Sequence, residues 1–274
     1  MPPDKYGEDW SRDEMILALY LYCQIPFSKT KANNPDVTKL AAILGRTPAS
    51  VARKLGNFGS FDPLLAKQGI SGLKHTSKAD RAIWEEFHHR WEALVELSSD
   101  LLHSLTQPSA GNEKNITALE IGEELERPTG PSERLAPARL RLFQSFFRRA
   151  VLAGYDCACC VCGIDIRSLL TASHIKPWSV DESVRTDPEN GLCLCAIHDR
   201  AFDRGLLAVS EELRVILAKS VLSSTQPFVR VTLADFQERP LRMPKRFAPR
   251  HELLAWHRGN LFDRPEALGA NFLD

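Results

Sequence analysis

The chain of 274 residues balances 35 Lys and Arg against 35 Asp and Glu, so its formal net charge is zero, and 43% of its residues are hydrophobic. This length and composition favour two globular domains and exclude wholesale disorder or a collagen-like repeat. The longest apolar run, from Met15 to Cys23, spans nine residues, and no basic flank precedes an apolar core at the N-terminus. We therefore expect a cytoplasmic protein without a membrane-spanning helix or a secretory signal.

The neutral total is the sum of three segments with different charges. Residues 1–106 carry 13 basic and 13 acidic residues, residues 107–133 carry 2 and 6, and residues 134–274 carry 20 and 16. The middle segment is rich in Pro, Gly and Ser at both ends, which is typical of an interdomain linker. It is either a solvated spacer or an acidic strip that occupies a basic groove until substrate arrives. The predicted organisation is therefore a domain over 1–106, an acidic linker over 107–133 and a second domain over 134–274.

Capping patterns predict the helices of the first domain. Ser11 and Glu14 form a capping box ahead of the apolar run, so a buried helix is expected to begin there and to end near Gln24. Ser77 is expected to cap one long helix that reaches about Leu105. Its apolar stripe either packs on the N-terminal bundle or mediates self-association. The stripe consists of Trp84, Phe87, Trp91, Leu94, Ser98, Leu101 and Leu105.

Two short helices joined by a glycine turn are predicted between Asp36 and Phe58. Gly45 ends the first helix, and Thr47 followed by Pro48 is typical of the start of the second. Such a pair is typical of helix-turn-helix DNA-binding proteins, although any small helical bundle can contain one. The outer face of the second helix is expected to carry Ser50, Arg53, Lys54 and Asn57, with Arg53 and Lys54 as the candidate DNA contacts.

An arginine-rich helix is predicted at the start of the second domain. From Arg134 to Tyr155 the chain has five arginines and no acidic residue. Arg141, Arg148 and Arg149 are expected to be available to phosphates. The residues expected to pack inward are Leu142, Phe146, Phe147 and Val151.

Six of the seven cysteines lie between Cys157 and Cys195, and clustered cysteines in a reducing compartment typically bind metal or do chemistry. Two C-x-x-C pairs overlap here, and Gly163 favours the second because a zinc knuckle turns back at a residue that tolerates positive φ. The spacing recurs from Cys195 to His198, which completes a tetrahedral set. The predicted structural Zn²⁺ ligands are Cys159, Cys162, Cys195 and His198. A shifted pairing that uses Cys157, Cys160 or Cys193, and ordinary core thiols, are the alternatives.

Between and after these pairs lie three further motifs, which read S-H-I-K-P-W from Ser173, N-G-L from Asn190 and H-D-R-A-F-D-R-G from His198. The cysteine pairs bracket a predicted strand, loop, second strand and helix. Over roughly residues 139–215 the chain resembles the HNH endonucleases, which are ββα-metal nucleases, in the variant found in bacterial restriction enzymes. The resemblance implies an α+β fold, with a helical, helix-turn-helix-like N-terminal domain and a C-terminal HNH nuclease domain stabilised by zinc. It also implies a role in restriction or defence.

The chemistry of phosphodiester hydrolysis requires an activated water and neutralisation of charge at the phosphate. His174 is the candidate general base, because imidazole titrates near neutrality, and Asn190 is expected to orient the loop that carries it. Asp199 and Asp203 lie four residues apart on the predicted helix, so both carboxylates project from one face as hard ligands for Mg²⁺ or Mn²⁺. The candidate phosphate contacts in this region are Lys176, Arg200 and Arg204.

Two departures from the family pattern leave alternatives open. The usual sequence has a metal-binding acid directly before the base histidine, where this chain has Ser173. His198, assigned above to zinc, is the alternative ligand of the catalytic ion. We expect a double-stranded DNA endonuclease that acts as a homodimer, because one ββα site cuts one strand. The competing hypotheses are a non-catalytic, zinc-containing DNA-binding regulator and an RNA nuclease or toxin.

After Gly205, a hairpin over 206–217 and a closing helix from His251 to Phe262 are predicted, the helix with Leu253, Leu254 and Trp256 buried. The basic residues between them either extend the DNA surface or form a solvated edge.

Overall fold

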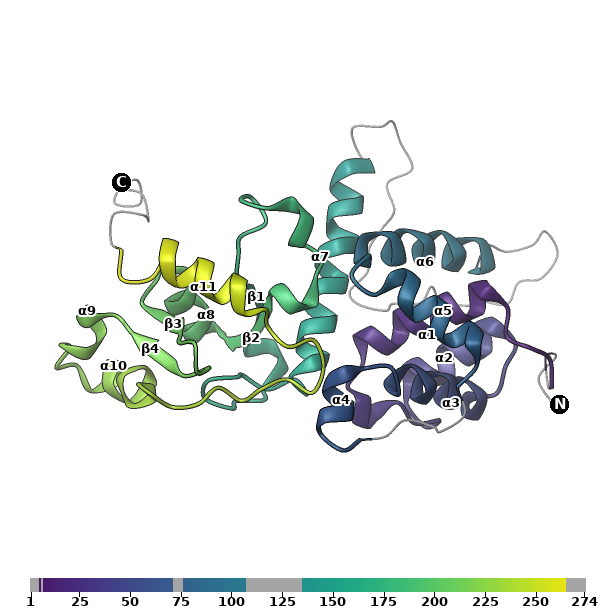
Figure 1. Cartoon of the computed structure of the whole chain (residues 1–274), viewed down its shortest axis with the longest axis horizontal. Coiled ribbons are helices and arrows are strands. Elements are labelled where there is room, and N and C mark those ends of the chain that lie inside the picture. Colours follow the sequence, from purple (N-terminus) through teal and green to yellow (C-terminus); the bar gives the residue numbers. More distant parts are fainter. Residues whose placement is uncertain (1–4, 6, 71–75, 107–134, 265–274) are drawn as a thin grey trace. The chain divides into compact units, whose positions relative to one another are not determined.

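The computed structural model describes residues 5, 7–70, 76–106 and 135–264 (Figure 1). The predicted linker over 107–133 lies outside these residues. The chain divides into two compact units, Met1–Ala153 and Gly154–Asp274. Within the described ranges, no helix combines the length and the apolar character needed to cross a membrane.

The first unit is built around helix α1 (Arg12–Gln24), which contacts α2 (Pro35–Leu44), α3 (Pro48–Gly59), α5 (Lys78–Phe87) and α6 (Trp91–Thr106). The unit also contains the short helices η1 (Phe27–Lys29) and α4 (Pro63–Lys67). The predicted capping box is confirmed, since the Ser11 side chain accepts from the Glu14 N–H and the Glu14 carboxylate accepts from the Ser11 N–H. Every residue of α1 from Glu14 onward is buried, because surrounding helices cover it on all sides.

Helices α2 and α3 confirm the predicted pair and its turn. Gly45 adopts a left-handed conformation with φ of 67°, and the Thr47 side chain accepts from the Ser50 N–H at the start of α3. The expected outer face needs a correction, because Lys54 is buried and its Nζ lies 2.6 Å from the Asp80 carboxylate on α5. Helix α5 therefore covers part of the face that was assigned to DNA.

The long helix predicted from Ser77 to Leu105 is two helices. Ser77 does cap α5 with a capping box, but the chain breaks at His88–Arg90, where His89 is left-handed with φ of 71°. A left-handed residue ends the ladder of helical hydrogen bonds and turns the chain. Trp84, Trp91 and most of the apolar stripe are buried within the unit, so this part of the stripe is core and is not free for self-association.

Helix α7 (Leu135–Gly154) confirms the predicted arginine-rich helix, but it groups with the first unit up to Ala153. Phe146 stacks on Tyr20 with ring centroids 5.7 Å apart and also contacts Trp91. Arg139 pairs with Glu96 of α6. The division between the two compact units therefore falls between Ala153 and Gly154, about twenty residues after the boundary expected between 133 and 134, because aromatic packing holds α7 on the N-terminal helices.

The second unit contains the predicted ββα arrangement. Strands β1 (Leu170–His174) and β2 (Gly191–Cys195) pair antiparallel, and helix α8 (Ala196–Asp203) contacts both. The predicted hairpin follows as β3 (Leu207–Val209) and β4 (Val215–Leu217). The remaining helices are η3 (Arg167–Leu169), η4 (Glu182–Val184), η5 (Pro188–Asn190), α9 (Lys219–Leu222), α10 (Pro227–Thr232), η6 (Ala234–Phe236) and α11 (His251–Asn260). In α11, Leu253 and Leu254 are buried as predicted, whereas Trp256 is only half-buried.

Candidate functional site

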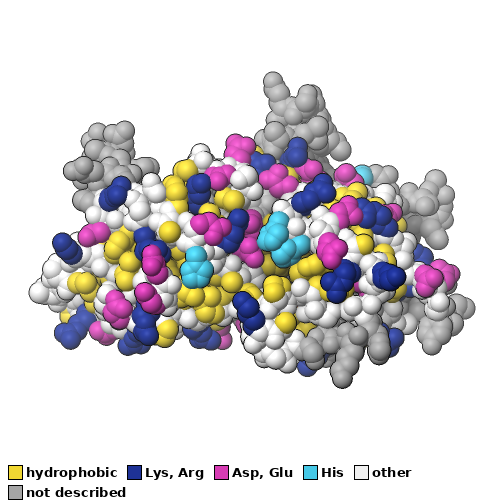
Figure 2. Space-filling model, in the orientation of Figure 1, with side chains coloured by type: hydrophobic (Ala, Val, Ile, Leu, Met, Phe, Trp, Pro, Cys, Tyr) yellow, Lys and Arg dark blue, Asp and Glu magenta, His cyan; other side chains and the backbone are white. Residues whose placement is uncertain are grey.

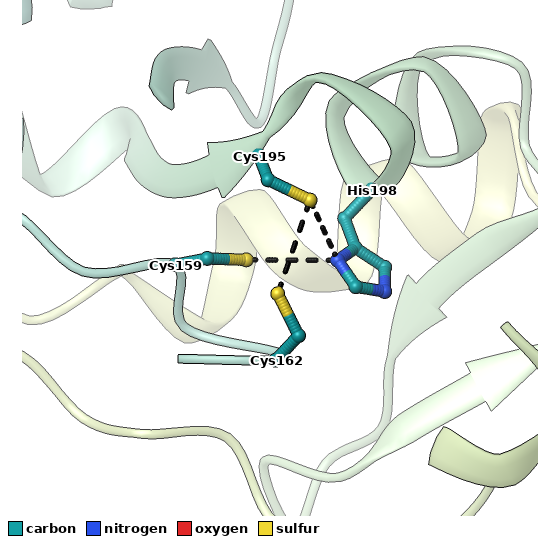
Figure 3. A group of neighbouring side chains, drawn as sticks. All are labelled: Cys159, Cys162, Cys195 and His198. Atoms are coloured by element: carbon teal, nitrogen blue, oxygen red, sulfur yellow. Dashed lines mark hydrogen bonds between the residues drawn. The ribbon is translucent and has the colours of Figure 1, made fainter. Parts of the chain in front are cut away.

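Four metal-ligating side chains converge in the second unit (Figure 3). Cys159 and Cys162 come from the loop that ends at Gly163, Cys195 ends β2, and His198 lies on α8. Their ligand atoms all lie within 4.8 Å of one another. Gly163 has φ of 79°, as the knuckle turn requires. This Cys₃His set is compatible with a closed structural zinc site.

The imidazole of His198 is oriented for that cluster. Its Nε2 lies 3.0 Å from the Thr232 carbonyl, which can only accept, so Nε2 carries the proton and Nδ1 presents its lone pair. Nδ1 lies 3.1 Å from the Cys195 sulfur and 3.6 Å from the Cys159 sulfur. A hydrogen bond from the Cys195 thiol lowers the pKa of the Cys159 thiol and outweighs the opposite effect of desolvation. The structure thus groups the 159/162 pair with His198, while Cys160 and Cys193 are buried outside the four-residue cluster.

His174 lies at the end of β1 with its imidazole half-buried. Its Nε2 lies 2.9 Å from the Arg185 carbonyl. Because a carbonyl only accepts, Nε2 donates and Nδ1 is the basic nitrogen. Desolvation lowers the pKa of His174 and outweighs the opposite effect of the Arg185 hydrogen bond. The ring is therefore neutral, and able to accept a proton, at neutral pH.

Asn190 is fully buried and holds the loop that follows His174. Its Oδ1 accepts from the Lys176 N–H at 2.9 Å, and its Nδ2 donates to the carbonyls of Lys176 at 3.0 Å and Val184 at 3.1 Å. These bonds join the two ends of the segment between β1 and β2. The role expected of Asn190, to orient the histidine-bearing loop, requires hydrogen bonds of this kind.

Asp199 and Asp203 lie close together on α8, facing Ser173 of β1. Desolvation raises the pKa of Asp199. Desolvation, followed by the charge of Asp199, raises the pKa of Asp203 to about 6, although the residue as a whole is exposed. The Ser173 hydroxyl interacts with both carboxylates, and this interaction partly offsets the rise in their pKa values. The hydroxyl oxygen is buried and makes no hydrogen bond of normal geometry. Two repelling carboxylates beside an unsatisfied hydroxyl form a site that favours a bound cation.

The basic side chains assigned to DNA fall into different environments. Arg200 is exposed beside the two carboxylates, Arg204 is half-buried, and Lys176 pairs with Asp181 at 2.8 Å. In the first unit, Arg53 and Arg148 are exposed. Arg149 and Lys54 need correction. Arg149 lies 3.6 Å from Asp36 with its side chain 12% exposed, and Lys54 is buried against Asp80. Figure 2 shows cationic and anionic side chains interspersed over the face in view.

Sequence reasoning missed three residues that support this site. The Thr232 carbonyl orients His198, Arg250 pairs with Asp187 and Glu189, and His257 contacts the backbone of α8. Local motifs could not reveal them, because each contact joins residues more than 30 positions apart.

Comparison with known proteins agrees with the local architecture. Residues 159–210 match the family model described as HNH endonuclease. Among solved structures, the chain is similar to a protein described as "Modification dependent TagI restriction endonuclease", with 24% identity, a TM-score of 0.33 and coverage of 42% of this chain and 37% of that one. Among curated proteins, none matches. The HNH endonuclease match therefore covers residues 159–210, which contain the Cys₃His cluster, His174 and both carboxylates.

Proposed function

We propose that the protein is a metal-dependent endonuclease that hydrolyses phosphodiester bonds of double-stranded DNA. The observation that carries the proposal is that one ββα unit contains both an oriented, neutral imidazole and a pair of carboxylates on one helix face. His174 supplies the first, and Asp199 with Asp203 supplies the second. These are the two functions that hydrolysis of a phosphodiester requires of side chains.

The donor set on α8 fits a hard divalent ion. Asp199 and Asp203 offer carboxylate oxygens, and the buried Ser173 hydroxyl beside them offers a neutral oxygen. Oxygen donors of this kind suit Mg²⁺ or Mn²⁺ better than zinc. When bound, the ion neutralises charge on the scissile phosphate and on the departing 3′ oxygen. Ser173 thus contributes an oxygen where the usual family sequence has an acid.

The protein's own groups would act on water and phosphate. His174 takes a proton from the attacking water at Nδ1, while the Arg185 carbonyl keeps the ring in the required tautomer. Asn190 keeps the following loop in place from a buried position. Arg200 and Arg204, whose charges both act on Asp203, hold neighbouring phosphates through charge-assisted hydrogen bonds.

The Cys₃His cluster would hold zinc in a structural role. All four of its donor positions come from the protein, so no position is left open for a substrate. Zinc bound there joins the knuckle, the end of β2 and the start of α8, and so fixes the helix that carries both carboxylates.

The proposal extends to restriction of foreign DNA by a homodimer. A double-strand break requires two ββα sites, because each acts on one strand. The family match to residues 159–210 supports the nuclease class, and the restriction role is the biological setting in which we place it.

A substrate panel tests the proposal. Supercoiled plasmid, with and without modified bases, and a structured RNA are each incubated with the full chain in Mg²⁺, in Mn²⁺ and in EDTA. We expect nicked and then linear plasmid with either ion, none in EDTA, and intact RNA. Plasmid left intact under every condition would leave the non-catalytic regulator as the better explanation, and selective cleavage of RNA would favour the RNA nuclease.

A further inference from the structure

Helix α11 lies outside the residues that match the nuclease family, yet it contacts three parts of the ββα unit. The family match covers residues 159–210, whereas α11 spans His251–Asn260. In Figure 1 this yellow helix lies beside α8, and contacts of its side chains and backbone join it to α8 and to both ends of the segment between β1 and β2.

Arg250, the N-cap residue of α11, is the first connection. Its guanidinium pairs with the Asp187 carboxylate, whose side chain is only 9% exposed, and lies 3.8 Å from the Glu189 carboxylate. Its backbone N–H also donates to the Glu189 carbonyl at 3.1 Å. Asp187 in turn accepts from the Glu189 N–H at 3.0 Å, which shapes the turn that ends at Asn190. A largely buried carboxylate is costly without a cation beside it, so Arg250 stabilises this turn.

That turn carries the groups that orient the candidate base. Asn190, which holds both Lys176 and Val184, is the last residue of η5. The Arg185 carbonyl, which fixes the imidazole of His174, lies two residues before Asp187. A shift of the turn would therefore move the Arg185 carbonyl, which accepts from the His174 ring, and the Asn190 side chain, which holds the loop after His174. Displacement of a reacting group by about 1 Å from a remote change can cost about 100-fold in rate.

Two more contacts tie α11 to the remaining parts of the unit. The His257 ring stacks on Phe202 of α8 with centroids 3.7 Å apart, and its Nε2 donates to the Phe202 carbonyl at 3.0 Å. The Trp256 ring lies 5.7 Å from the Lys176 ammonium, in the loop after His174. Just beyond α8, Gly205 has φ of 63°, and a Cβ there would clash with the carbonyl of Leu261, the residue that follows α11. The C-terminal helix thus contacts both the loop of the base and the helix of the carboxylates.

We propose that Arg250, at the N-terminal end of α11, is a positioning residue, which acts through Asp187 and Glu189 on the turn that orients His174. The inference rests on the proposed nuclease function for its catalytic meaning. Its structural part, that Arg250 orders the segment between β1 and β2, stands on the contacts alone.

The test compares Arg250→Gln with Arg258→Gln in the full chain. Arg258 is the matched control, because it lies on α11 and likewise contacts a backbone carbonyl and a carboxylate. It donates to the Val209 carbonyl at 2.8 Å and lies 3.5 Å from Glu211. These contacts join α11 to β3 and the loop after it, away from the turn that Arg250 contacts. We expect Arg250→Gln to lower kcat for plasmid nicking about 10- to 100-fold, with KM and zinc content unchanged. Arg258→Gln should keep the wild-type kcat, and Arg250→Lys should recover part of the loss because it keeps the charge beside Asp187.

Hydrogen exchange of the 175–190 amides provides a readout that does not need activity. Arg250→Gln should accelerate exchange of these amides, including the Lys176 N–H, which donates to the Asn190 side chain. Arg258→Gln should leave their exchange rates unchanged. If wild type cuts no DNA, the proposed function fails, and the exchange comparison still decides whether Arg250 orders this segment. Wild-type kcat and exchange in Arg250→Gln, or equal losses in both glutamine variants, would overturn the inference. If Arg250→Gln loses its zinc and does not fold, Arg250→Lys decides by the same two measurements.

Discussion

Replacing Asn190 with alanine should impair both the stability of the second unit and the rate of DNA cleavage. The side chain is fully buried and makes three hydrogen bonds, of 2.9, 3.0 and 3.1 Å, to the backbone at Lys176 and Val184. At roughly 1 kcal/mol for each bond, the free energy of unfolding should fall by about 3 kcal/mol, and by more if the freed backbone groups stay buried and unpaired. The loop after His174 loses its anchor at the same time, so we expect the cleavage rate to fall by about 100-fold.

Chemical unfolding and single-turnover nicking of plasmid measure these two effects. Asn260→Ala is the matched control, because Asn260 is exposed and its Nδ2 donates to the Trp256 carbonyl at 2.7 Å. That variant should change the free energy of unfolding by about 0.5 kcal/mol or less and leave the cleavage rate as it is. An Asn190→Ala protein that remains folded and cuts at the wild-type rate would refute the positioning role of this side chain.

Three further outcomes follow from the structure. Cys195→Ser should lower zinc content and make the second unit sensitive to limited proteolysis, because a structural zinc contributes directly to folding; full zinc retention would contradict the assigned ligand set. Desolvation lowers the pKa of His174 below the ordinary histidine value of 6.5, and the imidazole is a base only at a pH above its pKa. We therefore expect kcat/KM to fall as the pH is lowered, with a midpoint below 6.5. A midpoint above 6.5 would argue against His174 as the base. Lys54→Met should destabilise the first unit by about 3–5 kcal/mol, because it leaves the fully buried Asp80 carboxylate without its cation. The salt dependence of DNA binding by the folded protein should stay the same. A reduced salt slope would show that Lys54 contacts phosphate.

Local signals predicted the elements that local chemistry determines. The capping box at Ser11, the turn from Gly45 to Thr47 and the cysteine spacing around Gly163 each specify backbone conformation within a few residues, and the structure contains all three. The hallmarks of the ββα unit likewise fixed the order of its strands and helix. Spacing between cysteines and histidine was enough to identify a four-residue cluster that the folded chain brings together.

The features that the sequence did not predict depend mostly on contacts between residues that lie far apart in the chain. Helical spacing places Lys54 on an outward face, but the carboxylate of the distant Asp80 binds its ammonium in the folded chain. The single helix expected after Ser77 is interrupted because His89 adopts a left-handed conformation. The aromatic contacts of Phe146 placed α7 with the first unit. Arg250 and its helix carry no motif, so their contact with the candidate site became visible only in three dimensions.

The central claim is that this HNH domain cuts DNA with His174 as its base. Its most direct test is the rate at which wild type, His174→Ala and His103→Ala nick supercoiled plasmid in Mg²⁺, with His103 as an exposed histidine of α6 for comparison. We predict cleavage by wild type and His103→Ala at similar rates, and a loss of about 100-fold or more in His174→Ala with its zinc retained. Equal cleavage by all three proteins, or none by wild type, would contradict the account.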